Sequence, residues 1–183
     1  MSEDRVKAEG TKAATEKPPG VVREVLISLE LLLLSFWLGS MLFFSFAVAP
    51  SAFAALPSRH LAGLIVASTL KKVEFIGLAA GAALLLMQLA RWKSHRGGSR
   101  AKTARLMLLV VMAAAAGLSR FWVSPAMNSI RESMGGGIDD LPLTDPTRVH
   151  FNDLHQYSVS LMATAILAGI VVLFLTVRSW RAR

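Results

Sequence analysis

The chain contains four apolar stretches, each long enough to cross a lipid bilayer. No acidic or basic residue occurs from Leu31 through Ser58, and the first 19 residues of this stretch would form about 28 Å of helix. A segment inside lipid must satisfy its own backbone hydrogen bonds, so these stretches predict helices. The pattern predicts spans at about 25–49, 73–92, 106–127 and 154–177. The predicted fold is therefore an all-α, integral membrane four-helix antiparallel bundle.

The connections carry recognisable start and stop signals. Pro50 and Pro57 predict a turn or interfacial stretch after the first span. Ser58 can cap a helix that continues into the second span, and Asp145 followed by Pro146 can cap the fourth. The glycines at 135–137 predict a flexible loop between the third and fourth helices.

The two ends of the chain differ from the apolar region. Residues 1–22 are mostly polar and contain a Pro-Pro-Gly sequence at 18–20, so we expect a disordered tail. The four-transmembrane-helix domain is expected over 23–178, followed by a short tail at 179–183.

The distribution of Lys and Arg predicts the orientation in the membrane. The N-terminal tail carries five Lys and Arg residues, the loop after the second span six and the C-terminus three. The other two connections together carry five such residues. Cytoplasmic segments hold the excess of basic residues, so both termini are expected in the cytoplasm, in a plasma membrane such as a bacterial inner membrane.

Composition narrows the function classes. Hydrophobic residues make up 54% of the chain, and the net charge of +8 comes from residues between the apolar runs, which favours a lipid bilayer over nucleic acid as partner. The absence of cysteine excludes disulfides and thiolate metal sites. No phosphate-binding loop, HExxH sequence or nucleophile elbow is present, so we expect no enzymatic activity.

Polar residues at membrane depth are the candidates for a site, because they are costly in lipid. Helical geometry puts Glu74 roughly 12 Å and Arg120 roughly 6 Å from the bilayer centre, both toward the outer side. Together with His155 and Ser158 they form a predicted outer polar site. Two interpretations remain: an ion pair between Glu74 and Arg120 that fixes helix register, or a site for a solute.

A second polar element is expected in the inner half. Glu30 lies there, at a depth where Gln88 or Arg91 could satisfy it. Small residues that recur at helical spacing are expected to allow close helix packing; these are Gly39, Gly77, Gly81 and Gly117.

Metal and cofactor sites have limited support. Soft thioether and imidazole ligands suit copper, with Met41, Met162 and His155 as candidates, although methionine is also an ordinary packing residue. A haem would need two of His60, His95, His150 and His155, none of which is mid-membrane. The sequence therefore predicts no cofactor, with copper and haem as alternatives.

The order and spacing of short motifs over about 29–175 resemble the transmembrane-protein-205-like family, four-helix membrane proteins whose domain has no known function. The motifs are Trp37, Leu38, Gly39, Phe43, Phe44, Val48, Ala49, Pro50, Phe53, Leu56, Pro57, Glu74, Gly77, Arg120, Pro125, Arg131, Phe151, Leu154, His155 and Ser158. The family includes a vertebrate member associated with resistance to platinum drugs, and it is similar to copper-resistance D proteins. The resemblance implies handling of a metal or solute, but Arg120 beside the site favours an anion or a proton-coupled solute over a bare cation.

Three functions are compatible with these residues. The first is transport or tolerance of a small solute or metal through the outer polar site, with a homo-oligomer expected because four helices enclose little volume. The second is an accessory or structural subunit of a larger membrane complex. The third is a membrane haem or redox protein.

Overall fold

The computed structural model describes residues 19–94, 100–134 and 137–181, and every regular element in those ranges is helical. Of the tail expected at 1–22, residues 1–18 lie outside the described residues, as do His95 and the first two glycines of the 135–137 loop; residues 19–22 are helical, so the first helix begins earlier than expected. In chain order the elements are α2 (Pro19–Phe43), the π-helical turn η1 (Phe44–Val48), α3 (Ala49–Ala55), α4 (Arg59–Ser94), α5 (Arg100–Leu118), the π-helical turn η2 (Ser119–Val123), α6 (Ser124–Met134), the 3-10 turn η3 (Ile138–Asp140) and α7 (Pro146–Arg181).

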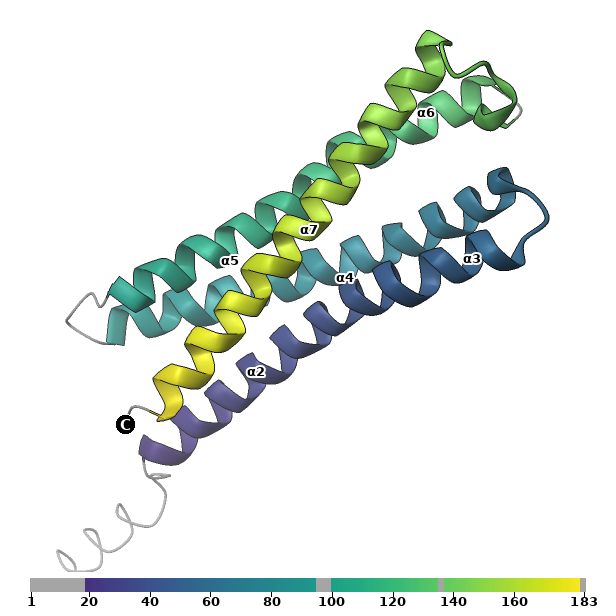
Figure 1. Ribbon diagram of the computed structural model, residues 1–183. Helices are drawn as coiled ribbons and strands as arrows, with labels where there is room; N and C mark the ends of the chain where they lie inside the picture. Colours follow the sequence, from purple (N-terminus) through teal and green to yellow (C-terminus); the bar gives the residue numbers. More distant parts are fainter. Residues whose placement is uncertain (1–18, 95–99, 135–136, 182–183) are drawn as a thin grey trace, which may run out of the picture.

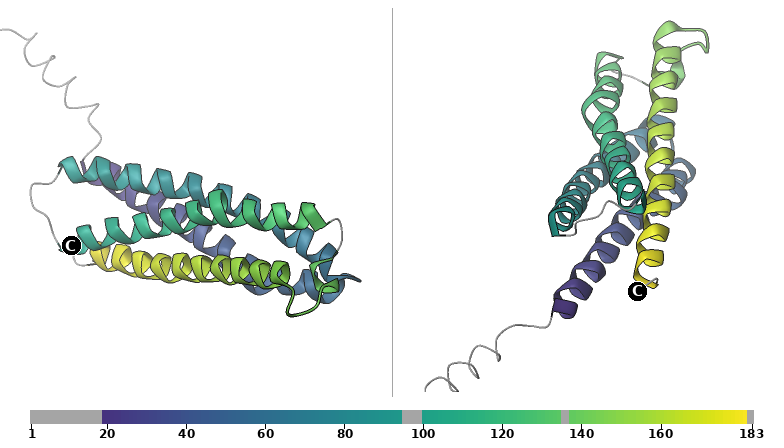
Figure 2. Two further views of the ribbon diagram at one scale, coloured as in Figure 1. Left: turned by 90° about the horizontal axis from the view of Figure 1, so that it is seen from above. Right: turned by 90° about the vertical axis from the view of Figure 1, so that its left-hand side faces the viewer.

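These elements form four long antiparallel helices, which confirms the predicted all-α membrane bundle (Figures 1 and 2). Helix α2 packs against α4 and α7, and α5 packs against α4 and α7, so neighbours in the bundle form a closed ring. The start of α2 and the end of α7 lie at one end, here called the proximal end. The opposite, distal end carries the connections at 56–58 and 137–145.

The helices are long and apolar enough to cross a membrane, by length and composition. Helices α4 and α7 each have 36 residues, or about 54 Å at 1.5 Å per residue, against a hydrocarbon thickness of about 30 Å. Large apolar side chains such as Leu32, Phe75 and Phe174 are exposed around the bundle, as expected where lipid replaces water. Each helix must therefore extend beyond the hydrocarbon region.

The first and third helices each contain a π-helical turn shortly before a proline. Pro50 follows η1 by two residues and Pro125 follows η2 by two residues. A proline inside a helix has no N–H and crowds the carbonyl four residues earlier, and a wider π turn relieves that contact. The helix therefore continues through Pro50 to Ala55, and the turn or interfacial stretch expected between Pro50 and Pro57 is confined to the bend at 56–58.

The predicted helix ends are partly correct. The Ser58 hydroxyl accepts a hydrogen bond from the Leu61 N–H at 3.2 Å, and an Asp145 carboxylate oxygen accepts one from the Thr147 N–H at 2.8 Å, which confirms both caps. The third helix extends to Met134, past the expected end at Met127.

The core of the bundle is centred on Trp37, whose side chain is 1% exposed. Its indole ring lies against two of the predicted packing glycines: a Cβ built on Gly77 would be 2.6 Å from Trp37 Nε1, and one on Gly81 would be 3.2 Å from Cη2. Gly77 and Gly81 thus allow α4 to pack closely against the Trp37 side chain of α2. Gly39 and Gly117 do not serve helix packing as expected, because a Cβ on either would meet no atom within 4 Å.

Candidate binding groove and buried polar clusters

A groove of about 670 Å³ opens at the distal end of the bundle. It lies between two helical hairpins, one formed by α3 and α4 and the other by α6 and α7, which are each packed internally. Apolar side chains from every one of these helices or their π turns line it, among them Phe44, Phe53, Val66, Met127 and Phe151. The groove is therefore mostly hydrophobic.

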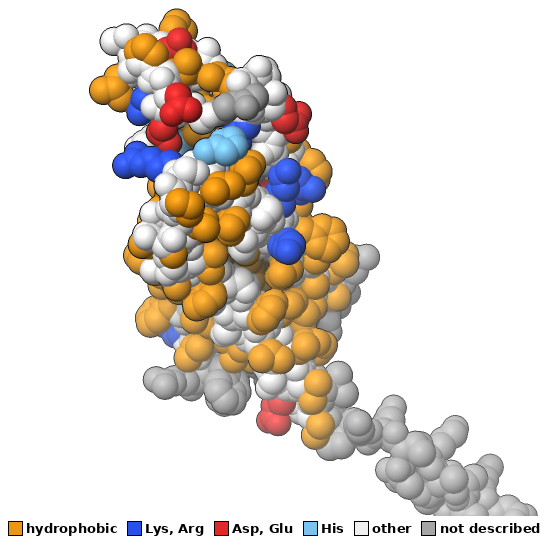
Figure 3. Space-filling model, turned by 90° about the vertical axis from the view of Figure 1, so that its right-hand side faces the viewer, with side chains coloured by type: hydrophobic (Ala, Val, Ile, Leu, Met, Phe, Trp, Pro, Cys, Tyr) orange, Lys and Arg blue, Asp and Glu red, His pale blue; other side chains and the backbone are white. Residues whose placement is uncertain are grey.

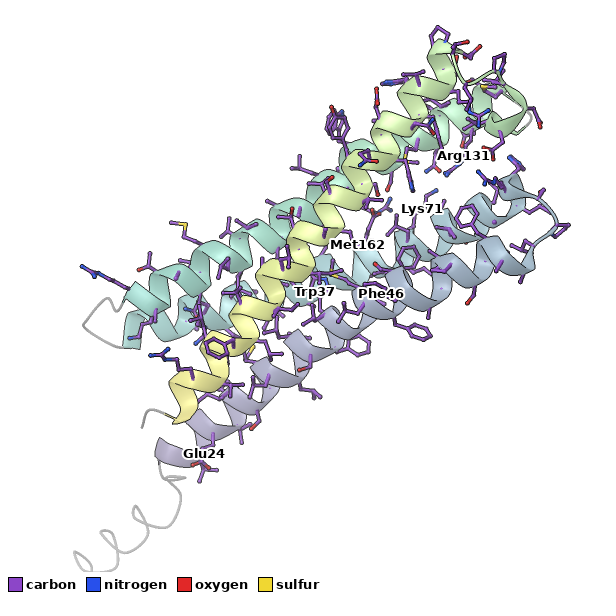
Figure 4. All side chains as sticks on the ribbon, in the orientation of Figure 1. Glu24, Trp37, Phe46, Lys71, Arg131 and Met162 are labelled. Atoms are coloured by element: carbon purple, nitrogen blue, oxygen red, sulfur yellow. The ribbon has the colours of Figure 1, made fainter. Side chains whose placement is uncertain are left out.

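Basic side chains lie along this apolar groove. Arg59 and Lys71 come from α4, and Arg131 comes from α6. Figure 4 shows Lys71 and Arg131 on the two sides of the space between the hairpins, and Figure 3 shows basic side chains at this end above a broad hydrophobic surface. The acidic residue in the lining, Asp139, lies 3.6 Å from an Arg148 nitrogen. The groove thus carries a positive charge excess.

Arg131 is held in a defined position. Its guanidinium carbon is 4.9 Å from the centre of the Phe151 ring, a cation–π distance, and its Nη1 donates to Asn128 Oδ1 at 3.5 Å. A Cβ on Gly63 would be 3.8 Å from Arg131 Nη2, so the arginine reaches across to α4. These contacts place a permanent cation at the groove wall.

Three predicted candidates line the groove: His155, Ser158 and Met162, all on α7. The Met162 sulfur accepts a hydrogen bond from Ser45 Oγ at 3.0 Å. Met41 lies instead in the buried core cluster. In the described residues no three His, Asp or Glu side chains gather as a metal site.

Two of the four histidines considered as haem ligands lie at the groove, and His95 is outside the described residues. His60 lines the groove with His155, but His150 is exposed and is not part of the lining.

Glu74 is buried directly below the groove, with 5% of its surface exposed. Its Oε1 accepts hydrogen bonds from Ser119 Oγ at 2.5 Å and Ser124 Oγ at 3.0 Å. Ser119 and Ser124 are five residues apart, which in an α-helix would turn them about 140° from each other. The π turn joins them instead, because the Ser124 N–H donates to the Ser119 carbonyl. Both hydroxyls can then face the same carboxyl group.

The expected ion pair between Glu74 and Arg120 is not formed. Arg120 is partly exposed and, among the described side chains, has no ion-pair partner within 4 Å. Its neighbour Ser119 occupies the face of the helix that points to Glu74. The sequence argument missed both serines because it assumed an α-helix through this segment.

Glu30 at the proximal half is paired with a residue that the sequence analysis had placed in a loop. Its side chain is fully buried and accepts a hydrogen bond from Arg105 Nη2. Gln88 is buried beside this region, and its Nε2 lies 3.4 Å from the Lys102 carbonyl oxygen. The side chain of Arg91, the other expected partner of Glu30, lies outside the described residues. Arg105 could have been found as the basic residue directly before the third apolar stretch.

Comparison with known proteins identifies the family of this chain. The model of a domain of unknown function, DUF4149, matches residues 32–135. No curated protein and no solved structure matches the chain. The match extends from within α2 to the end of α6, so it includes Glu74 and both serines but neither Glu30 nor α7. Because it covers more than half of the sequence, the chain belongs to the DUF4149 family, defined by a domain of unknown function.

Proposed function

We propose that this protein binds an anionic amphiphile in the distal groove, as a membrane protein for transport or tolerance of such a solute. The observation that carries the proposal is the position of Lys71 and Arg131 on opposite sides of an apolar groove. A carboxylate or phosphate between them would gain charge-assisted hydrogen bonds, with Arg131 offering a two-pronged donor.

The rest of the groove suits the apolar part of such a molecule. Aromatic side chains from three segments line it, including Phe46, Phe53 and Phe151. Its volume of about 670 Å³ falls within the usual range for small-molecule sites, roughly 300 to 1,000 Å³. An alkyl chain could lie against these rings while its head group remains at the basic residues.

The core limits how the solute could move. The packed core cluster includes Trp37, Leu84 and Met112, and Figure 4 shows Trp37 between the groove residues and the proximal end of the bundle. Transport would therefore require the hairpins to rearrange or a second copy to complete a path. The finer resemblance to transmembrane-protein-205-like and copper-resistance D proteins is consistent with handling of a solute, and we propose binding and movement instead of catalysis.

The location belongs to the same proposal. We infer a plasma membrane with both termini in the cytoplasm, which puts the groove on the outer side. The excess of Lys and Arg at the proximal connections supports this orientation. The stacked Trp122 and Tyr157 rings, 6.4 Å apart and both largely exposed, suit the outer membrane–water interface.

Calorimetric titration of dodecyl phosphate into protein in a non-ionic detergent tests the binding proposal. We expect Lys71→Gln and Arg131→Gln each to weaken binding by about tenfold or more, because a hydrogen bond to a charged group contributes roughly 1.5–3 kcal/mol. The matched control is Arg100→Gln, an exposed arginine at the start of α5, which should bind as the unmodified chain does. Equal binding of dodecyl phosphate by all of these proteins would contradict the proposal.

A further inference from the structure

The Glu74 carboxyl group has one oxygen that the surrounding side chains do not satisfy. Both serine hydroxyls donate to Oε1, whereas Oε2 is buried and has no hydrogen-bond partner. Because the residue is only 5% exposed, bulk water cannot take that place. A buried carboxylate without a counter-charge is strongly unfavourable, so this oxygen indicates a missing positive partner.

A small void adjoins Glu74. It measures about 30 Å³ and is lined by Glu74, Ser119, Trp37, Met41 and Met162, among other residues. A void of this size can hold about one water-sized species. A hydrated metal complex or an organic solute would be too large.

The charges around the void do not supply the partner. In its lining, Glu74 is the sole titratable group: α2 contributes Trp37 and Met41, and α5, η2 and α7 contribute small or apolar side chains. The nearest basic residues in the sequence of α4, Lys71 and Lys72, are exposed, and Arg120 on η2 forms no ion pair with Glu74. His155 and Arg131 line the groove above instead.

We propose that Glu74, Ser119 and Ser124 form a binding site for one monovalent cation, a proton or Na⁺. Either ion neutralises one carboxylate, and each can be held by oxygen atoms alone. The three side chains supply a carboxylate and two hydroxyls, which are hard ligands of the kind that small hard cations prefer. A divalent cation would keep an uncompensated charge beside a single carboxylate.

The site lies where it can respond to the groove. Ser124 donates to Glu74 and also lines the groove, and Met162 and Leu70 line both the groove and the void. A cation at Glu74 would make the region beneath the basic side chains less negative and so favour an anion above it. The site itself does not depend on what the groove binds.

Two measurements on the full-length purified protein test the site. Infrared spectroscopy detects the C=O stretch of a protonated carboxyl group, and a band removed by Glu74→Gln would identify a bound proton. Titration with NaCl at constant ionic strength, balanced by N-methylglucamine chloride, detects Na⁺. If Na⁺ is the ligand, we expect binding to be lost in Glu74→Gln and weakened about tenfold in Ser124→Ala.

Glu132→Gln is the matched control, because Glu132 is an exposed carboxylate on α6. It should leave both signals unchanged. Ser124→Ala provides a second variant if Glu74→Gln does not fold, and gel filtration and circular dichroism report folding for each. The proposal is overturned if the folded, unmodified chain shows neither a protonated Glu74 nor Na⁺ binding. This outcome is independent of whether dodecyl phosphate binds in the groove.

Discussion

At the scale of single residues, the buried charged groups form specific polar contacts between helices. Glu30 and Arg105 form an ion pair in which neither side chain is exposed by more than 9%. Glu74 is held by hydroxyl groups and not by a basic residue. That Glu30 and Glu74 lie inside the bundle could be predicted from their places in the apolar stretches. Their partners could not, because the partner of a buried charge depends on helix rotation and packing.

Removing one member of the Glu30–Arg105 pair should strongly destabilise the protein. We expect Arg105→Met to lower the free energy of unfolding by about 3–5 kcal/mol, since it leaves a buried charge without its arginine partner. The double variant Arg105→Met with Glu30→Gln should regain most of that loss. Reversible unfolding in mixed micelles gives the free energy of unfolding of the unmodified chain, the single variant and the double variant. A double variant no more stable than Arg105→Met would contradict this explanation.

Gly77 and Gly39 form a matched pair for testing the role of glycine. Gly77→Ala should destabilise the bundle by about 1–3 kcal/mol, because its Cβ would overlap the Trp37 ring. Gly39→Ala should be neutral or slightly stabilising, since its Cβ meets open space. The melting temperatures of the two variants can be compared by monitoring thermal unfolding with circular dichroism. Similar melting temperatures for the two variants would show that the tryptophan contact has no energetic consequence.

At the scale of elements, the two π turns distinguish this bundle from four regular helices. Each precedes a proline, at Pro50 and Pro125, and the second brings two serines to Glu74. The sequence predicted four helices and two of their caps correctly because hydrophobic length and capping residues are local signals. It expected a turn or interfacial stretch to begin at Pro50 because local rules treat an internal proline as a helix stop, whereas packing can stabilise a wider turn instead.

The π turn should be necessary for the contact between Ser124 and Glu74. In the unmodified chain, a double-mutant cycle with Ser124→Ala and Glu74→Gln should give a coupling energy of about 1 kcal/mol. In a Pro125→Ala background the helix can return to α geometry, and the coupling should fall to near zero. The coupling energies in both backgrounds are calculated from free energies of unfolding measured in micelles. Equal coupling in both backgrounds would mean that the proline does not maintain the turn.

At the scale of the whole molecule, the bundle is closed around its core and opens at the distal end between two hairpins. The four-helix membrane architecture followed from the sequence. The groove did not, because its position depends on where the hairpins separate, although three of the candidates named from the sequence, His155, Ser158 and Met162, line it. Lys71 had been counted only among the flanking basic residues, and Arg131 among these residues and the family motifs.

The orientation can be tested because the chain has no cysteine of its own. A single cysteine introduced at Ser133, near the distal end of α6, should react with a membrane-impermeant maleimide added to intact cells. One introduced at Arg100, at the start of α5 near the proximal end, should react only after the membrane is opened. Labelling in the reverse order would overturn the inferred orientation of the termini.

The groove proposal is tested most directly by a crystal structure of the protein with a bromine-labelled alkyl phosphate. We predict that the phosphate lies between Lys71 and Arg131 and that the anomalous signal of the bromine lies in the groove among Phe46, Phe53 and Phe151. A phosphate bound elsewhere on the bundle, with the groove closed by packed hairpins or filled by neutral detergent alone, would contradict the proposal.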